Sequence, residues 1–194
     1  MIVDKSQVIT ANRYLSESEK QINATYIKQE FIKAGWTLNA ICGMLGNMDA
    51  ESNINPGLWE SLQENNTSRG FGLTQWTPAT KLIDYANNVS GDYHDIDVQI
   101  SRILYELKNG VQFYKTNTYP ISFKQFSLSK ESPEYLAGAF LYNYERPAVY
   151  NIKPRQERAR KWWNYFVNES GEVGEIHHKE KMSLLLMAMA IKRR

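Results

Sequence analysis

The stretch ICGMLGNMDAESNINP, residues Ile41–Pro56, predicts a helix with the acidic residue Glu51 near its end. Its apolar positions recur every three to four residues, which is typical of a helix buried on one side. These positions are Ile41, Met44, Leu45 and Met48. Gly43 and Gly46 lower helix propensity, so we expect them to allow close packing against a neighbouring helix.

Glu51 lies at the predicted C-terminal end of this helix. The residues that follow include Asn53, Asn55 and Pro56, which favour turns, so the helix should end soon after Ser52. The helix dipole and poor hydration both disfavour a charged carboxylate at such a position. A side chain that keeps its proton near neutral pH suits general acid catalysis. The alternative is an exposed glutamate at a fraying helix end, and this stretch alone favours neither.

The composition indicates a globular protein. The chain has 194 residues, of which 42% are hydrophobic and 12% aromatic. A formal charge of +2 is too small to indicate nucleic-acid binding. A single cysteine, Cys42, excludes an intramolecular disulfide and a cysteine-rich metal site, and we expect it to be buried. The pair His177-His178 is a weak metal signal, so we expect neither a metal nor a cofactor.

Neither end of the chain carries a strong membrane or export signal. The first sixteen residues are polar and lack the apolar core of a signal peptide, so no signal peptide is expected. The longest apolar run, Met182–Ile191, is much shorter than the ~20 residues that a membrane-spanning helix needs. The sequence therefore predicts no membrane span, and a protein that acts outside its cell would leave by lysis, in a particle or through a separate export machine.

The remaining helix signals predict a mainly α fold with at most a small β element near 70–76, where apolar and polar residues alternate. Helices are expected after five capping or first-turn signals. These are Ser18 with Gln21, Thr37, Thr77-Pro78, Ser122 and Ser132-Pro133. A last helix is expected over Arg155–Val167. The predicted division is a polar lead-in at 1–17, one domain at 18–167, and a linker with a short apolar and basic tail at 168–194.

Three short motifs occur in a fixed order along the chain: Glu51-Ser52 with Asn55-Pro56, then Gly70–Pro78, then Leu141–Pro147. Glu-Ser, Gly-Leu-x-Gln and Tyr-Asn in this order resemble the goose-type lysozyme and lytic transglycosylase superfamily. The closest resemblance is to the lysozyme domain that phages of Gram-positive bacteria carry at the tail tip. It covers roughly Ser18–Phe166.

This resemblance implies a lysozyme-like helical fold with a cleft for the glycan of peptidoglycan. It makes Glu51 the general acid that protonates the leaving sugar oxygen. It also implies a set of substrate-binding residues: Ser52, Gly72, Leu73, Gln75, Trp76, Asn143 and Tyr144. Two of them have structural alternatives, because Gln75 could brace its own loop and Trp76 could fill the core.

A second catalytic carboxylate is not identified by the sequence. The candidates are Glu60, Glu64, Asp84 and Glu145. For Glu145 the adjacent Arg146 makes a structural ion pair the favoured interpretation. A lytic transglycosylase needs no second carboxylate, because a hydroxyl of the substrate closes a 1,6-anhydro ring.

The predicted function is a muramidase that cleaves between N-acetylmuramic acid and N-acetylglucosamine. The alternatives are a lytic transglycosylase acting on the same bond and a catalytically idle module for wall binding or tail assembly. The expected partners are peptidoglycan glycan strands and other phage tail proteins, without nucleic acid. The expected location is the virion tail or the outside of the host cell.

Overall fold

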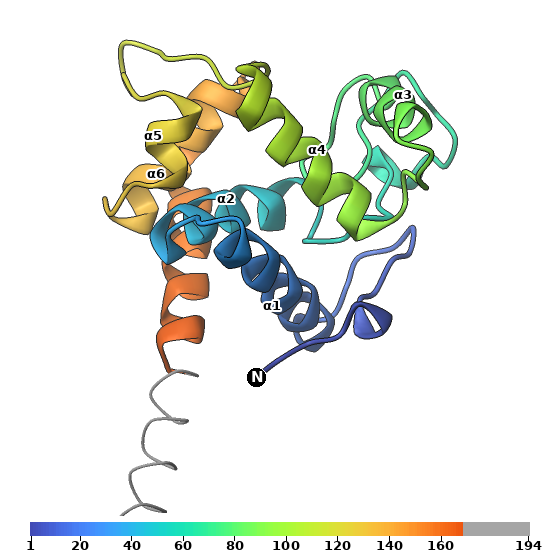
Figure 1. Ribbon diagram of the computed structural model, residues 1–194, viewed down its shortest axis with the longest axis horizontal. Helices are drawn as coiled ribbons and strands as arrows, with labels where there is room; N and C mark the ends of the chain where they lie inside the picture. Colours follow the sequence, from blue (N-terminus) through green and yellow to red (C-terminus); the bar gives the residue numbers. More distant parts are fainter. Residues whose placement is uncertain (169–194) are drawn as a thin grey trace, which may run out of the picture.

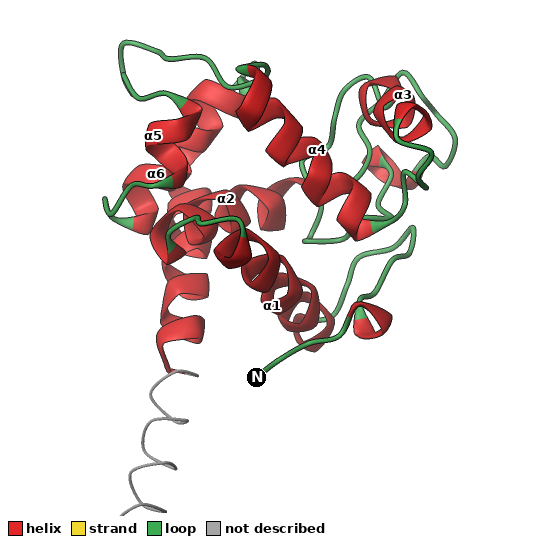
Figure 2. Ribbon diagram, in the orientation of Figure 1, coloured by secondary structure: helices red, strands yellow, loops and turns green. Residues whose placement is uncertain are grey.

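The computed structural model describes residues 1–168 and is mainly helical, as predicted (Figures 1 and 2). Residues 169–194, which include the His177-His178 pair and the apolar run 182–191, lie outside the described residues. The helices are α1 (Glu17–Lys33), α2 (Leu38–Glu51), α3 (Thr80–Asn88), α4 (Ile96–Asn109), α5 (Phe123–Ser127), α6 (Pro133–Phe140) and a helix over 152–168. Shorter turns are η1 (Lys5–Gln7), η2 (Glu60–Leu62) and the π-helix η3 (Leu141–Glu145).

Helix α2 is the central helix of the fold, and other helices pack around it (Figure 1). Every residue from Ala40 to Asp49 is buried, so α2 is enclosed on all sides rather than on the single side that the periodicity indicated. The predicted close packing at its two glycines is confirmed. A Cβ at Gly43 would lie 2.7 Å from Leu136 Cβ in α6, and one at Gly46 would lie 2.5 Å from the Arg155 carbonyl oxygen.

Most helix starts follow the predicted caps. The side chains of Thr37, Ser122 and Ser132 each accept a hydrogen bond from a backbone N–H in the first turn of α2, α5 and α6. Two predicted starts were wrong. Helix α1 is capped by Ser16, which forms a capping box with Glu19, two residues before the predicted cap. Helix α3 has Ala79 as its N-cap, so Pro78 precedes the helix.

The expected small β element is reduced to two isolated bridges, Trp59 with Phe71 and Phe71 with Trp76. These bridges fold the second motif back against the 58–60 segment, and they bring Trp59 and Phe71 together with ring centroids 4.5 Å apart. After α6 the chain does not turn at once, because it continues as the π-helix η3 to Glu145. π-Helical turns are rare and frequent at functional sites.

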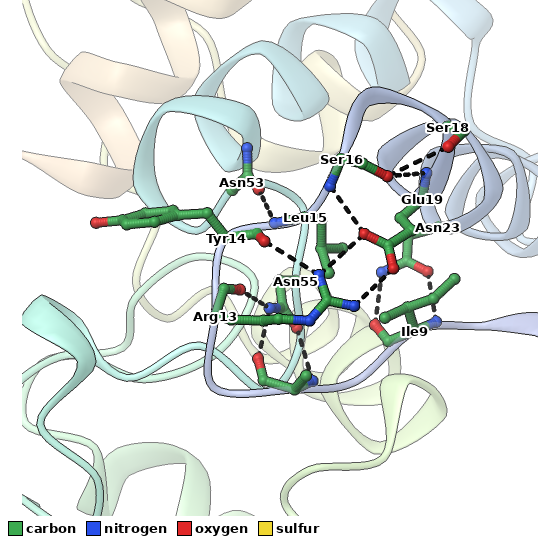
Figure 3. A network of polar contacts seen from close by, with 11 residues as sticks. Ile9, Arg13, Tyr14, Leu15, Ser16, Ser18, Glu19, Asn23, Asn53 and Asn55 are labelled. Atoms are coloured by element: carbon green, nitrogen blue, oxygen red, sulfur yellow. Dashed lines mark hydrogen bonds and ion pairs between the residues drawn. The ribbon is translucent and has the colours of Figure 1, made fainter.

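The polar lead-in before α1 is held to the domain by three asparagines (Figure 3). Asn23 in α1 bonds both the N–H and the carbonyl of Ile9 at 2.8 Å. Asn53 accepts from the backbone N–H of Leu15, and Asn55 accepts from the N–H of Ala11 at 3.3 Å. The asparagines after Glu51 therefore fix the path of the lead-in as well as ending α2.

Among residues 1–168, no helix combines the length and the apolar character needed to cross a bilayer.

Candidate active site

One cavity of about 540 Å³ contains most of the polar residues that the three motifs contribute. Its wall is formed by the lead-in, the end of α2, the two bridged segments, the start of α3 and the chain around η3. The lining residues are Tyr14, Glu51, Leu58, Trp59, Glu60, Ser61, Thr74, Gln75, Trp76, Thr77, Lys81, Gln112, Tyr144, Glu145, Arg146 and Pro147. Segments far apart in the sequence therefore converge on one concave surface.

Glu51 is the last residue of α2 and reaches this cavity with 24% of its side chain exposed. Its Oε1 forms an ion pair with Nη2 of Arg155, from the helix over 152–168. This contact depends on Gly46, because the Arg155 backbone approaches α2 where a side chain is absent. The sequence did not reveal this partner, which lies 104 positions away. Glu51 is therefore held in an ion pair, which the helix-end argument did not predict.

Glu145 is the last residue of η3 and lines the same cavity. Its Oε1 is buried without a hydrogen-bond partner. Burial raises the pKa of Glu145 well above its usual range, and the negative charge of Glu51 raises it further. The guanidinium groups of Arg155 and Arg146 oppose this rise without cancelling it.

The ion pair predicted between Glu145 and Arg146 was wrong. Arg146 instead donates to the carbonyl oxygen of Asn143 at 2.8 Å and to that of Gln112. Its guanidinium also lies 4.8 Å from the ring centroid of Tyr114. Arg146 thus fixes the loop after α4 to the end of η3, and within residues 1–168 no ion pair of Glu145 is formed.

The other candidate carboxylates are less suited to catalysis. Glu60 lines the cavity but accepts from Arg69 at 2.8 Å and from the Gly70 N–H at 2.9 Å, so it braces the 60–70 loop. Glu64 and Asp84 are exposed and do not line the cavity. Glu145 is therefore the candidate that shares the cavity with Glu51 and has no bracing partner among the described residues.

Two aromatic residues of the cavity wall, Trp76 and Tyr144, are anchored from behind by Glu106 of α4. The Trp76 indole donates to Glu106 Oε1 at 3.0 Å, and the Tyr144 hydroxyl donates to Oε2. Arg102 donates to the same carboxylate at 2.8 Å. Burial raises the pKa of Glu106, and these three donors oppose the rise. A glutamate on the apolar face of α4, three residues after Ile103, was the sequence signal that could have revealed this anchor.

Gln75 and Gly72 shape the second motif. Gln75 lines the cavity, and its side-chain amide donates to the carbonyls of Leu58 and Gly72 at 3.0 Å each, which supports the bracing alternative. Gly72 has a φ of +80°, and a Cβ there would lie 2.7 Å from Gln99 Oε1. The close approach that requires glycine is thus made by Gln99 of α4.

Like the buried Gly72, three further residues of the predicted substrate-binding set do not line the cavity. Ser52 is buried and donates to the carbonyls of Met48 and Leu73, which joins the Glu-Ser motif to the Gly-Leu-x-Gln motif. The Leu73 side chain is buried in the core. Asn143 is buried and donates to the Tyr119 carbonyl at 2.9 Å. These side chains support the residues that do line the cavity.

Sequence reasoning missed several lining residues outside the three motifs, among them Tyr14, Lys81 and Gln112. Tyr14 comes from the lead-in, which lies outside the predicted domain, and its side chain points away from the bonded turn in Figure 3. No local pattern distinguishes these residues from ordinary surface residues, because their position follows from long-range packing.

Comparisons with known proteins match most of the chain. The family model described as phage tail lysozyme matches residues 22–166. A protein named Morphogenesis protein 1, from Bacillus phage B103, is 48% identical over 152 residues, which is 78% of this chain. The chain spans 41% of the length of that relative.

Proposed function

Because the chain belongs to the phage tail lysozyme family, we propose that its cavity acts as a muramidase on bacterial peptidoglycan. The bond cleaved is the β-1,4 linkage between N-acetylmuramic acid and N-acetylglucosamine. Membership of this family supports the broader description, a lysozyme-like domain that degrades peptidoglycan in a phage tail. The proposed catalytic domain is 18–167, with the lead-in 1–17 packed against it.

Three carboxyl groups line the cavity, and Glu60 among them braces its own loop. The observation that carries this proposal is that the other two, Glu51 and Glu145, lie in unlike environments. Glycoside hydrolysis needs a proton for the leaving oxygen and a negative group or positioned water at the anomeric centre. Trp76 and Tyr144 belong to the core and support the cavity wall, as the core-filling alternative for Trp76 predicted. Tyr14, which is 66% exposed, is the lining residue that offers aromatic surface on which a sugar ring can pack.

The second carboxyl favours hydrolysis over the transglycosylase reaction. In a transglycosylase, a hydroxyl of the substrate attacks the anomeric carbon and one acid–base residue suffices. Glu145 lies in the same cavity as Glu51, although burial and the charge of Glu51 both disfavour its ionisation. A second carboxyl group kept there fits a reaction in which water is activated. A hydrolysed product carries the elements of water, and an anhydro product lacks them.

The proposed location is the virion tail. The relative from phage B103 is named for morphogenesis, which supports a role in or on the particle. The proposed partners are the glycan strand and neighbouring tail proteins.

The Glu51→Gln variant tests the proposed function. It keeps the size of the side chain and removes its ability to carry a proton or a charge. We expect it to bind purified cell walls as the parent does and to clear them at least ~10²-fold more slowly, in line with the usual contribution of acid–base catalysis. Glu60→Gln, a change of the same type in the same cavity, is the matched control and should clear walls normally. Equal clearing by Glu51→Gln and the parent would refute the proposal.

A further inference from the structure

Helices α3 and α4 contact each other and form a second pocket, of about 360 Å³ (Figure 1). It is lined on the α3 side by Lys81, Asp84 and Tyr85 and on the α4 side by Arg102 and Tyr105, and we call it the α3–α4 pocket. Lys81 also lines the active-site cavity, so the pocket and the cavity adjoin at this side chain. A ligand that fills the cavity can therefore extend into the α3–α4 pocket.

The wall of the α3–α4 pocket is held in place before any ligand binds. The Arg102 guanidinium lies 5.2 Å from the ring centroid of Tyr85 and 5.5 Å from that of Tyr105, and the two ring centroids are 5.3 Å apart. Arg102 also donates to the buried carboxylate of Glu106 at 2.8 Å, which accepts from Trp76 as well. The pocket and the cavity wall thus share one anchor. Side chains that are already oriented lose less entropy on binding.

The α3–α4 pocket presents one positive and one negative group to solvent. Lys81 and Asp84 are exposed and lie three positions apart on α3, which places them on the same side of the helix. Within residues 1–168 neither of them forms an ion pair. The Arg102 charge is already balanced by its ion pair with Glu106. The groups left to meet a ligand are therefore an ammonium, at the border with the cavity, and a carboxylate one turn further along α3.

The charges of the pocket match the peptide part of peptidoglycan and not the glycan. The amino groups of the glycan are N-acetylated, and the muramic carboxyl is bonded to the peptide, so the strand itself is uncharged. The stem peptide carries carboxylates, a free amine on its diamino residue where it is not cross-linked, and alanine methyl groups. Tyr105 and Val89, which are 44% and 49% exposed, offer apolar surface to these methyl groups.

We propose that the α3–α4 pocket binds the stem peptide of an N-acetylmuramic acid residue held in the active-site cavity. A peptide carboxylate pairs with Lys81, the free amine pairs with Asp84, and alanine methyl groups pack on Tyr105. Because the peptide is bonded to the sugar through its lactyl group, it reaches the pocket past Lys81, where the two sites adjoin. This proposal rests on the proposed function and deepens it by assigning a site to the second component of the substrate.

Calorimetric titration with two soluble glycan oligomers of equal length tests the proposal. One keeps its stem peptides, and the other has lost them to an amidase and has its freed lactyl carboxyls capped as methylamides. Both are titrated into the full chain carrying Glu51→Gln, which is expected to leave them uncut. We expect the peptide-bearing oligomer to bind ~5–10-fold more tightly. Adding Tyr105→Ala should remove most of this preference and leave the affinity for the stripped oligomer unchanged.

Tyr150→Ala is the matched control for Tyr105→Ala. Tyr150 is 42% exposed and stacks on Tyr142 with ring centroids 4.2 Å apart, but it lines neither the cavity nor the α3–α4 pocket. This variant should keep the full preference for the peptide-bearing oligomer.

Asp84→Asn tests the charge contact separately, at an exposed position where the fold is not at risk. It should weaken binding of the peptide-bearing oligomer ~2–5-fold, in line with an exposed ion pair. Acetylation of the free amine of the peptide should weaken binding to the chain with Asp84 by the same factor. The acetylated oligomer should bind the Asp84→Asn variant no more weakly than the free amine does.

Two results would overturn the proposal. One is equal affinity for the peptide-bearing and the stripped oligomer, which would leave the pocket to another partner such as a neighbouring tail protein. The other is an equal loss of both affinities in Tyr105→Ala, which would assign this surface to the glycan. The proposed function fails in a different way, through a parent chain that cuts neither oligomer in mass analysis, and a preference measured by calorimetry would still stand.

Discussion

The contact between α2 and the helix over 152–168 can be tested by adding one methyl group at Gly46. In Gly46→Ala the new Cβ would lie 2.5 Å from the Arg155 carbonyl oxygen and 2.8 Å from the Ala159 nitrogen. Ordinary contacts between nonbonded heavy atoms are about 3.5 Å, so the two helices must separate by roughly 1 Å. Both obstacles are backbone atoms, which cannot rotate away.

The magnitude follows from two opposing effects. Overpacking a well-packed core costs about 1–3 kcal/mol, and the gain in helix propensity from glycine to alanine returns about 1 kcal/mol. Because the clash is with backbone, we expect a net loss of about 1–2 kcal/mol in the free energy of unfolding. The same displacement moves Arg155 away from Glu51, so wall clearing per folded molecule should also fall.

Urea unfolding followed by circular dichroism measures the first effect, and turbidity clearing measures the second. Gly35→Ala is the control, because a Cβ there meets nothing within 4 Å while the φ of +83° makes any side chain unfavourable. It should lose roughly 1–2 kcal/mol for its left-handed backbone and keep normal clearing. A Gly46→Ala protein as stable and as active as the parent would refute the close packing of these helices.

Three further predictions follow from the same contacts. Glu145→Gln should unfold at higher temperature than the parent at pH 8 and at a similar temperature near pH 4. Folding raises the pKa of Glu145, so above its unfolded pKa of about 4.3 the folded parent loses about 1.4 kcal/mol of stability per pH unit, until the folded pKa is reached. Glutamine does not titrate, so the variant avoids this loss. A stability difference that does not grow with pH in thermal scans would contradict this. Ser52→Ala should lower the free energy of unfolding by about 1–3 kcal/mol, because it removes the buried hydroxyl that donates to the Met48 and Leu73 carbonyls. The folded fraction of this variant should still clear walls, since Ser52 does not line the cavity. An unchanged free energy of unfolding in urea would argue against this buried bond. Glu60→Gln should retain wall clearing within a few-fold in a turbidity assay, because Glu60 braces Arg69 and Gly70, and a loss as large as that of Glu51→Gln would restore Glu60 as a catalytic candidate.

Local signals in the sequence predicted the helices well. The caps Thr37, Ser122 and Ser132 depend on one or two turns of chain, so they are visible in a short stretch. The Ser18 cap failed because Ser16 offers the same chemistry with Glu19 in the matching position. Two capping boxes overlapped in the sequence, and the packing of the lead-in decides between them.

The candidate site was predicted in part. Glu51, Gln75, Trp76 and Tyr144 line the cavity as the motifs indicated. The roles of the buried members could not be predicted, because a motif shows which residues belong together and does not distinguish a cavity wall from its support. Ser52 is such a support.

The charge contacts of the site could not be predicted from the sequence. The Arg155 contact with Glu51 joins residues 104 positions apart, and neither residue carries a local sign of the other. The π-helical turn that continues α6 places the half-buried Glu145 at the cavity with its Oε1 buried. The adjacent Arg146 suggested an ion pair along the chain, whereas the fold directs that side chain to backbone carbonyls of the neighbouring loop.

The masses of the fragments released from purified peptidoglycan test the proposed muramidase activity most directly. The parent and Glu60→Gln should release glycan fragments that end in reducing N-acetylmuramic acid and contain the added water, and Glu51→Gln should release none above background. Fragments with uncut glycan strands, or identical fragments from Glu51→Gln, would contradict the assignment of glycan cleavage to this cavity.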